Sequence, residues 1–212
     1  MAKIRKIHRS LKEGRNYYVI DANFLSNKYL DPKIAPSIKD KKQIEKCQDW
    51  WKEIDKQLKN DDARIYIPDL CIAEAFKTLA KKYYSGTGFI NAASYNYRRK
   101  KLIKDITIPA GDLQNFNRKI KYHDISTSRD LIIAVDRFFE IFIKNRHNVS
   151  VIDLIILATA KYLMDFFDLP KNHVHIITCD KPLRTGSKKV QELPHVYDPT
   201  EQEDEISKVF ID

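Results

Sequence analysis

Four short apolar runs, separated by segments with helical periodicity, constrain the fold of this chain more than any other feature. Residues 17–20 (YYVI), 63–68 (ARIYIP) and 174–179 (VHIITC) have the length and composition of buried strands, and a last short strand is expected at 195–197. Short apolar strands that alternate with helices are typical of α/β proteins. The sequence therefore predicts an α/β fold with a small, largely parallel central sheet flanked by helices.

The segments between these runs have the spacing of helices. In residues 38–60 apolar side chains recur at steps of three and four, the period of one helix face. Ser150 is a suitable N-cap for the segment that follows it, and Asp69 for the segment after the second strand. The segment after Ser150 is apolar almost all round, so it is expected to be deeply buried. Further helices are expected at 69–84, 90–103, 112–122, from 126 onward and at 151–167.

The composition is that of one ordinary globular domain. The chain has 212 residues, of which 43% are hydrophobic and 32% are charged. No apolar run approaches the roughly 20 residues that a membrane span needs. The N-terminus is basic and lacks the apolar core of a signal peptide. A cytoplasmic protein with no membrane association is therefore expected.

The cysteines and two closely spaced histidines give no metal or disulfide signal. Cys47, Cys71 and Cys179 do not have zinc-ligand spacing or the pattern of a disulfide framework, and each is expected to be a small buried apolar side chain. His173 and His175 alternate at the start of a predicted strand, and we expect them to face solvent rather than to bind a metal.

Positive charge is concentrated in two segments of a chain whose net charge is +9. Residues 81–121 hold ten lysines and arginines against Asp105 and Asp112. Residues 1–15, with a helix expected at 4–11, hold six against one glutamate. A polyanionic partner explains this distribution, and the alternative is a solvated surface with chance clustering.

Acidic residues stand at the ends of the predicted elements. Asp21 and Asp180 directly follow apolar strands, while Glu74 and Asp153 lie in the first turns of helices. The carboxyl ends of parallel strands and the starts of the helices that follow them share one edge of a sheet, so the four side chains can converge on one pocket.

Each of these acids also has a structural alternative. Asp21 can cap the helix that begins near residue 24, and Asp180 can be a turn residue. Asp153 stands three positions after Ser150, as in a capping box. Glu74 can face solvent.

Four carboxylates in one pocket predict a bound cation. Crowded carboxylates raise one another's pKa and oppose folding, and a divalent ion relieves this repulsion. All-oxygen ligands suit Mg²⁺ or Mn²⁺ rather than zinc. We therefore predict one or two such ions at a site formed by Asp21, Glu74, Asp153 and Asp180.

The four segments that carry these acids resemble a known family. VIDANFL, IPDLCIAEAFKTL, SVIDLIILATA and HIITCDKPL are similar, in order and spacing, to the four acidic motifs of PIN-domain nucleases. The resemblance matches the same four acids as catalytic and metal-binding residues, and Asn23 and Thr178 as polar supporting residues. It implies one PIN-like domain over residues 1–212, with helical insertions at 31–62 and 85–125 and a basic N-terminal helix at 1–15.

The resemblance also implies an activity and partners. PIN domains are typically Mg²⁺- or Mn²⁺-dependent ribonucleases, and many are VapC-type toxins of toxin–antitoxin pairs. We expect an endoribonuclease that hydrolyses single-stranded RNA to 3′-hydroxyl and 5′-phosphate ends, with Glu74 ligating or orienting the attacking water. The expected partners are RNA, an antitoxin or other protein inhibitor, and a second copy of the chain in a homodimer.

Aromatic rings are interleaved with the cations of residues 81–121. Rings that stack on bases, beside cations that bind phosphates, suit single-stranded nucleic acid. Phe89 and Phe116 are expected instead to pack the insertion onto the domain. The residues predicted to contact RNA are Tyr95, Tyr97, Arg98, Arg99, Lys100 and Lys101. Two alternative functions stay open: a non-catalytic RNA-binding module of the PIN fold, and a DNA or flap-type nuclease.

Overall fold

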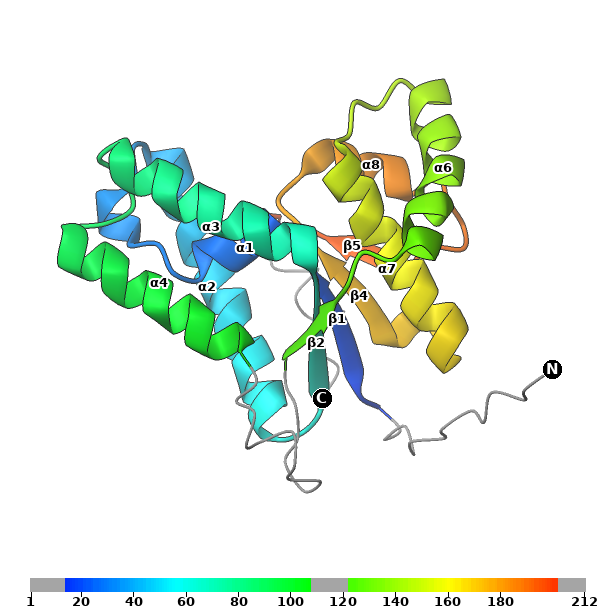
Figure 1. Cartoon of the computed structure of the whole chain (residues 1–212), viewed down its shortest axis with the longest axis horizontal. Coiled ribbons are helices and arrows are strands. Elements are labelled where there is room, and N and C mark those ends of the chain that lie inside the picture. Colours follow the sequence, from blue (N-terminus) through cyan, green and yellow to red (C-terminus); the bar gives the residue numbers. More distant parts are fainter. Residues whose placement is uncertain (1–13, 108–121, 202–212) are drawn as a thin grey trace.

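The fold is built around one five-stranded parallel sheet, seen in a computed structural model that describes residues 14–107 and 122–201 (Figure 1). The strands lie in the order β3-β2-β1-β4-β5, and every neighbouring pair is parallel. Their bounds are β1 Asn16–Ile20, β2 Ala63–Pro68, β3 Tyr122–Ile125, β4 Val174–Ile177 and β5 His195–Tyr197. The predicted α/β fold with a parallel sheet is confirmed.

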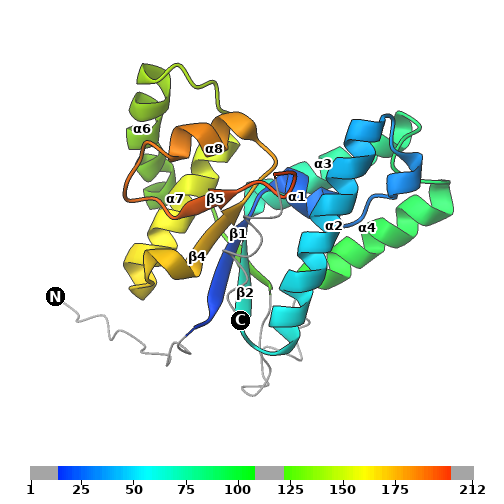
Figure 2. The same cartoon turned by 180° about the vertical axis from the view of Figure 1, so that it is seen from behind.

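Helices connect the strands and cover both sides of the sheet. Figures 1 and 2 show α1 to α4 gathered on one side and α6, α7 and α8 on the other. The order of the strands reverses between β1 and β4, which is the position where ligands bind in open α/β sheets. The bounds are α1 Ala22–Asn27, η1 Pro32–Ile34, α2 Ile38–Lys59, α3 Asp69–Tyr84, α4 Ala92–Ile106, α6 Arg129–Lys144, α7 Val151–Phe167, η2 Lys171–His173 and α8 Lys181–Ser187.

Helix α2 follows the predicted apolar period closely. Ser37 caps it by accepting a hydrogen bond from the Asp40 backbone N–H. The Trp51 ring stacks on Phe24 of α1 at 4.9 Å, and its indole N–H donates to the Phe24 carbonyl at 3.0 Å. The buried side chains of α2 are Ile44, Cys47, Trp50, Trp51, Ile54 and Leu58. This packing holds α2 firmly against α1.

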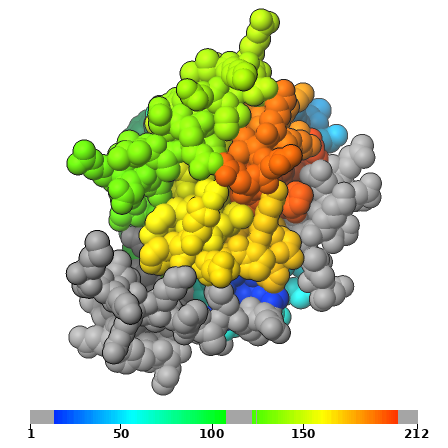
Figure 3. Space-filling model, turned by 90° about the vertical axis from the view of Figure 1, so that its right-hand side faces the viewer, coloured from blue at the N-terminus to red at the C-terminus, as the bar shows by residue number. Residues whose placement is uncertain are grey.

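Helix α7 begins at the capping box that the sequence predicts. The Ser150 hydroxyl accepts from the Asp153 N–H, while the Asp153 carboxylate accepts from the Ser150 backbone. Residues 154–160 are buried, but Val151 at its start and Tyr162 and Phe166 towards its end are exposed, so the expectation of deep burial holds only for the middle of the helix. Figure 3 shows α7 in yellow on a face that it shares with α6 and α8.

Helix α8 was not predicted, and it packs with very little clearance. A Cβ atom at Gly186 would overlap the ring of Phe142, which reaches it from α6. Only glycine lets the α8 backbone approach this ring so closely. Helix α8 escaped prediction because it is seven residues long and contains both Pro182 and Gly186.

Several predicted details differ from the structure. Pro68, not Asp69, caps α3, and Asp69 is the first helical residue. Strand β3 lies in the 85–125 segment, which is therefore not a purely helical insertion. Helix α4 is held to α3 by Tyr95, which stacks on Tyr83 at 4.4 Å. The predicted helices at 4–11 and 112–122 lie almost wholly outside the described residues, which omit 1–13 and 108–121.

His175 does not face solvent as expected, because β4 is an inner strand of the sheet. Its side chain is 3% exposed, and its Nε2 lies 2.9 Å from Asn16 Oδ1. Asn16 and Tyr18 in turn donate to Gln57 of α2 at 3.1 and 2.8 Å. Burial, together with the neighbouring His173 and His195, lowers the pKa of His175 to about 3. The imidazole is therefore neutral in this network at ordinary pH.

Protonation of His175 should destabilise the fold in acid. The folded-state pKa is depressed, so the unfolded chain binds this proton first, and the free energy of unfolding falls as pH drops from about 6.5 towards 3. The contribution approaches about 1.4 kcal/mol per pH unit. Denaturant unfolding of the wild type and His175→Gln across this range measures it, and the variant should show the weaker pH dependence. Equal slopes in both proteins would contradict this assignment.

Candidate active site

Asp21 lies at the carboxyl end of the central strand β1, where the order of the strands reverses. Its side chain is 3% exposed. Its backbone N–H donates to the Ile177 carbonyl of β4 at 3.1 Å, which continues the ladder between the two strands. The Thr178 hydroxyl donates to Asp21 Oδ2 at 3.0 Å. Among the described residues no cation is paired with this carboxylate.

Burial raises the pKa of Asp21 to about 7. The hydrogen bond from Thr178 and the backbone N–H of Asn23 lower it, while the charges of Asp153 and Glu74 raise it. The electrostatic effect of these two acids shows that α7 and α3 bring them near the same strand tip. An ionised Asp21 is therefore in an unfavourable environment at neutral pH.

Asp180 lies at the neighbouring strand tip, after β4. It is the N-cap of α8, and its Oδ1 accepts from the Leu183 backbone N–H at 2.6 Å. Burial raises its pKa, the Leu183 N–H lowers it, and the charges of Asp153 and Asp198 raise it. The structural alternative of a turn residue is thus replaced by a helix cap.

Cys71 of α3 lies close enough to three of the predicted acids to be affected by their charges. Burial raises the pKa of its thiol, and the charges of Asp21, Glu74 and Asp153 raise it further. Asp21, Glu74 and Asp153 therefore all act on this one thiol, and Asp153 also acts on Asp180 at the neighbouring strand tip. Asp180 is linked to Asp21 through the Thr178 hydroxyl.

The four side chains do not form a ready coordination shell. The Asp153 carboxylate accepts from the Ser150 backbone and hydroxyl at 2.8 and 2.7 Å, so it acts as a capping-box residue. Asp180 caps α8 in a similar way. Over residues 14–107 and 122–201, no group of three or more His, Cys, Asp or Glu side chains is placed to hold a metal ion.

The chemistry of the donor set nevertheless fits a hard divalent cation. The acids supply only oxygen atoms, and the most buried of them is an anion without a counter-charge among the described residues. An ion at this edge would be held by Asp21 with Glu74, Asp153 or Asp180. The caps engage Asp153 Oδ2 and Asp180 Oδ1, so the second oxygen atom of each carboxylate would be the one available to such an ion.

Thr178 links the two strand-tip acids, whereas Asn23 does not reach them with its side chain. The Thr178 Oγ1 donates to Asp21 and accepts from the Asp180 backbone N–H at 2.9 Å. One fully buried hydroxyl thus fixes the spacing of both acids. Asn23 is exposed on the first turn of α1, and only its backbone N–H affects Asp21.

Asp198 is a fifth acid at this edge that sequence reasoning missed. It follows β5 directly, is 6% exposed, and raises the pKa of Asp180. Its Oδ1 accepts from the Thr200 backbone and hydroxyl at 2.9 and 2.7 Å. The signal in the sequence was an Asp after a predicted strand, as for Asp21, but the strand is only three residues long.

The predicted RNA-contacting residues lie on α4, and the structure separates them into two groups. Tyr95 is half-buried in a stack with Tyr83 and an edge contact with Phe89, so it packs the insertion onto the domain. Tyr97 is 64% exposed. The Arg99 guanidinium lies over the Phe76 ring at 5.9 Å. Arg98 is half-buried, while Arg99, Lys100 and Lys101 are exposed.

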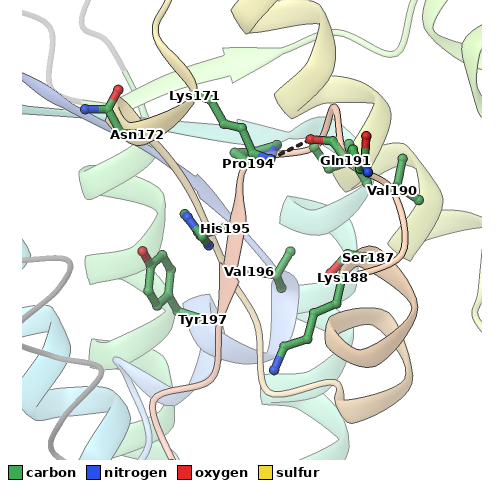
Figure 4. A pocket seen from close by; sticks show the side chains of 11 residues that line it. Lys171, Asn172, Ser187, Lys188, Val190, Gln191, Pro194, His195, Val196 and Tyr197 are labelled. Atoms are coloured by element: carbon green, nitrogen blue, oxygen red, sulfur yellow. Dashed lines mark hydrogen bonds between the residues drawn. The ribbon is translucent and has the colours of Figure 1, made fainter.

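Two hollows in the surface lie outside the acidic edge. One, of about 560 Å³, follows the edge strand β5, with His195 and Tyr197 on one side of the strand and Val196 and Lys188 on the other (Figure 4). A second, of about 730 Å³, lies between α2 and Thr200, and its lining includes the lysines Lys39, Lys42 and Lys46. Neither is lined by any of the four predicted acids.

Solved structures share this fold. The FitAB complex bound to an IR36 DNA fragment contains a similar chain with a TM-score of 0.52 and 12% identity, covering 88% of this chain and 97% of that one. FitAcB from Neisseria gonorrhoeae gives a TM-score of 0.48 and 12% identity, covering 87% and 99%. VapBC2 from Rickettsia felis, bound to a DNA fragment from its promoter, gives 0.48 and 10%, covering 86% and 98%.

These similarities concern the fold. The five-stranded parallel sheet flanked by helices is that of PIN-domain structures, so the predicted PIN-like fold is confirmed. No protein-family model and no curated protein matches the sequence. Among the helices that the structure describes, none is both long enough and apolar enough to cross a membrane.

Removing the charge of Asp21 should stabilise the protein when no divalent cation is present. Its pKa is raised on folding, so the penalty is full above about pH 7 and disappears as pH falls towards 3.8. Asp21→Asn should therefore raise the free energy of unfolding by roughly 1–4 kcal/mol at pH 8, and less at pH 5. Denaturant titrations with EDTA at both pH values measure this difference.

Added Mg²⁺ or Mn²⁺ should stabilise the wild type and not Asp21→Asn. Asp165→Asn is the control, because Asp165 is an exposed aspartate on α7 paired with Lys161. If Asp21→Asn is less stable than wild type by the same amount at both pH values, the ionised form of Asp21 does not destabilise the fold.

Proposed function

We propose that this protein is a metal-dependent nuclease of the PIN fold, most specifically an endoribonuclease acting on single-stranded RNA. The observation that carries the proposal is the environment of Asp21. A carboxylate is buried at the switch point of the sheet, faces the charges of Asp153 and Glu74, and has no paired cation among the described residues. A fold retains so unfavourable a group most readily where a ligand compensates it.

The proposed roles follow from these positions. Asp21, Asp153 and Asp180 would hold one or two Mg²⁺ or Mn²⁺ ions, and Glu74 would ligate or orient the attacking water. Such an ion, when bound, lowers the pKa of water and stabilises negative charge on a phosphodiester oxygen. Thr178 orients Asp21 and holds the Asp180 backbone, so it fixes the distance between the two acids. Asp21 must lose its proton for binding, which favours activity above pH 7.

Helix α4 offers the surface that supports a nucleic-acid substrate. Arg99, Lys100 and Lys101 are exposed beside the exposed ring of Tyr97. Exposed cations can bind phosphates, and an exposed ring can stack on an unpaired base. The resemblance to PIN domains favours RNA and ends of the 3′-hydroxyl and 5′-phosphate type.

A protein partner is proposed from the structural comparison. FitAB, which has the same fold, is bound to a DNA fragment in its solved structure. If this chain is a toxin of a toxin–antitoxin pair, an antitoxin or other inhibitor would hold it inactive by covering the acidic edge. A homodimer is proposed from the family resemblance alone.

A non-catalytic nucleic-acid-binding module is the second candidate. It is favoured by one observation, because Asp153 and Asp180 both act as helix caps and no three-donor group is assembled among the described residues. Such a module would bind RNA and leave it intact with or without a divalent cation.

Cleavage of labelled single-stranded RNA and DNA separates these functions. With Mg²⁺ or Mn²⁺ the wild type should cleave RNA, and EDTA should abolish cleavage. Thr178→Val should lower the rate by roughly 10–100-fold, because it removes the group that orients Asp21. Asp21→Asn should lower it further, and Asp165→Asn should have no effect. Intact RNA under all conditions supports the binding module, and cleavage that persists in EDTA excludes the metal-dependent reaction.

Binding should depend on the exposed cations of α4 and on salt. Changing Arg99, Lys100 and Lys101 to glutamine should weaken RNA binding. It should also reduce the slope of log K against log salt by about 0.7 for each phosphate that is no longer neutralised. Lys52, Lys56 and Lys59, exposed on the far end of α2, give a charge-matched control. Fluorescence anisotropy with catalytically silent Asp21→Asn protein measures both. Equal losses of affinity in the two triple variants would mean that only net charge matters.

A further inference from the structure

Two cysteines that are 132 positions apart in the sequence meet beside the acidic edge. Cys47 Sγ lies 3.5 Å from Cys179 Sγ, within hydrogen-bond reach of a thiol. Cys47 is fully buried on α2, and Cys179 is partly exposed in the loop between β4 and α8. The pair was not expected from the sequence, where each cysteine was predicted to be an inert apolar group.

The Cys47 sulfur also has a second polar neighbour. The Asn27 side-chain amide lies 3.5 Å from it and donates from the end of α1. Asn27 is itself buried. Asn27 and Cys179 thus hold the Cys47 sulfur from two sides, which fixes its position relative to Cys179.

Cys179 stands between the two residues that order the strand-tip acids. Thr178 precedes it and donates to Asp21, while Asp180 follows it and caps α8. Any displacement of the Cys179 backbone therefore moves the Thr178 hydroxyl and the Asp180 carboxylate together.

We propose that Cys47 and Cys179 form a modification site at which a peroxide closes a disulfide that disables the acidic edge. Each thiol gives up one hydrogen atom, the sulfur–sulfur bond forms, and the O–O bond of hydrogen peroxide breaks to give two waters. A disulfide such as oxidised glutathione serves equally, and leaves as two reduced thiols. The sulfur atoms must move from 3.5 Å to about 2.05 Å.

The loop yields in this movement, and the helix does not. Cys47 is one turn from Trp50 and Trp51, which are buried under α1 and the sheet. Cys179 is in a connection between two short elements, β4 and α8. Closure therefore draws Cys179 towards α2 and pulls the Thr178 hydroxyl away from Asp21.

The bond itself is tested on the native protein, without any activity assay. Hydrogen peroxide should remove two hydrogen atoms from the intact mass, and proteolysis without reductant should yield one peptide pair that joins residues 47 and 179. Cys71→Ser should behave like the wild type, because Cys71 is equally buried but has no thiol neighbour among the described residues. Cys47→Ser and Cys179→Ser should form no bond. Linkage through Cys71, or no linked pair in folded wild type, overturns the site.

The effect on the acidic edge rests on the proposed function and has its own readouts. Oxidised wild type should lose about tenfold or more in cleavage rate and in Mn²⁺ affinity, as expected when a group orienting a ligand is displaced. Reductant should restore both, and Cys47→Ser should be insensitive to peroxide. Unchanged cleavage in protein with the mapped disulfide overturns the regulatory role. If neither redox state cleaves RNA, the proposed function fails while the mapped bond stands.

Discussion

The hydrogen bond between Thr178 and Asp21 joins the ends of β1 and β4, the two strands between which the strand order reverses. It holds a carboxylate in a position that water barely reaches, and the same hydroxyl receives the backbone N–H of Asp180. Hydrogen bonding to the charged form favours ionisation of Asp21, but burial and two nearby acids oppose it more strongly. The charged form of Asp21 is therefore disfavoured, and α3 and α7 contribute to this by adding the negative charges of Glu74 and Asp153.

Two helix caps at this edge are made by acids that are also proposed to bind a cation. Asp153 and Asp180 stabilise the starts of α7 and α8 by accepting backbone N–H groups, which a helix needs at its first turn. The second oxygen atom of each carboxylate takes no part in these caps and is the one that the proposed cation would use. An acid at a helix start is favoured by the helix dipole with or without a ligand. A capping role and a proposed ligand role can therefore fall on one residue.

Much of the fold could be predicted because the local signals agree with one another. Helix α2 has both its apolar period and a Ser37 cap, and α7 has its capping box. Strand β3 could not be predicted, because YHDI at the edge of the sheet pairs with only one neighbour and has no apolar run. The burial of His175 and the meeting of Cys47 with Cys179 depend on contacts across 159 and 132 positions. Such contacts leave no periodic trace in a single sequence.

For the acidic edge, the sequence predicts that the four acids lie at strand ends and helix starts, but it does not show which hydrogen bonds each carboxylate accepts. That Asp180 would cap α8 depends on a helix too short and too rich in Pro and Gly to predict. Asp198 escaped for a similar reason, since β5 has three residues. Tyr95 was assigned to RNA because it stands beside RRKK, yet its ring finds Tyr83 one helix away.

The contact between Gly186 and Phe142 has a consequence for how related chains can vary. The α8 backbone rests on an aromatic ring from α6, and α8 begins directly after its cap, Asp180. A side chain at position 186 would lift the helix and shift its cap with it. A smaller residue at 142 would leave room for alanine at 186. Related chains should therefore change these two positions together, as a co-varying pair that connects a distant helix to the spacing of the acids.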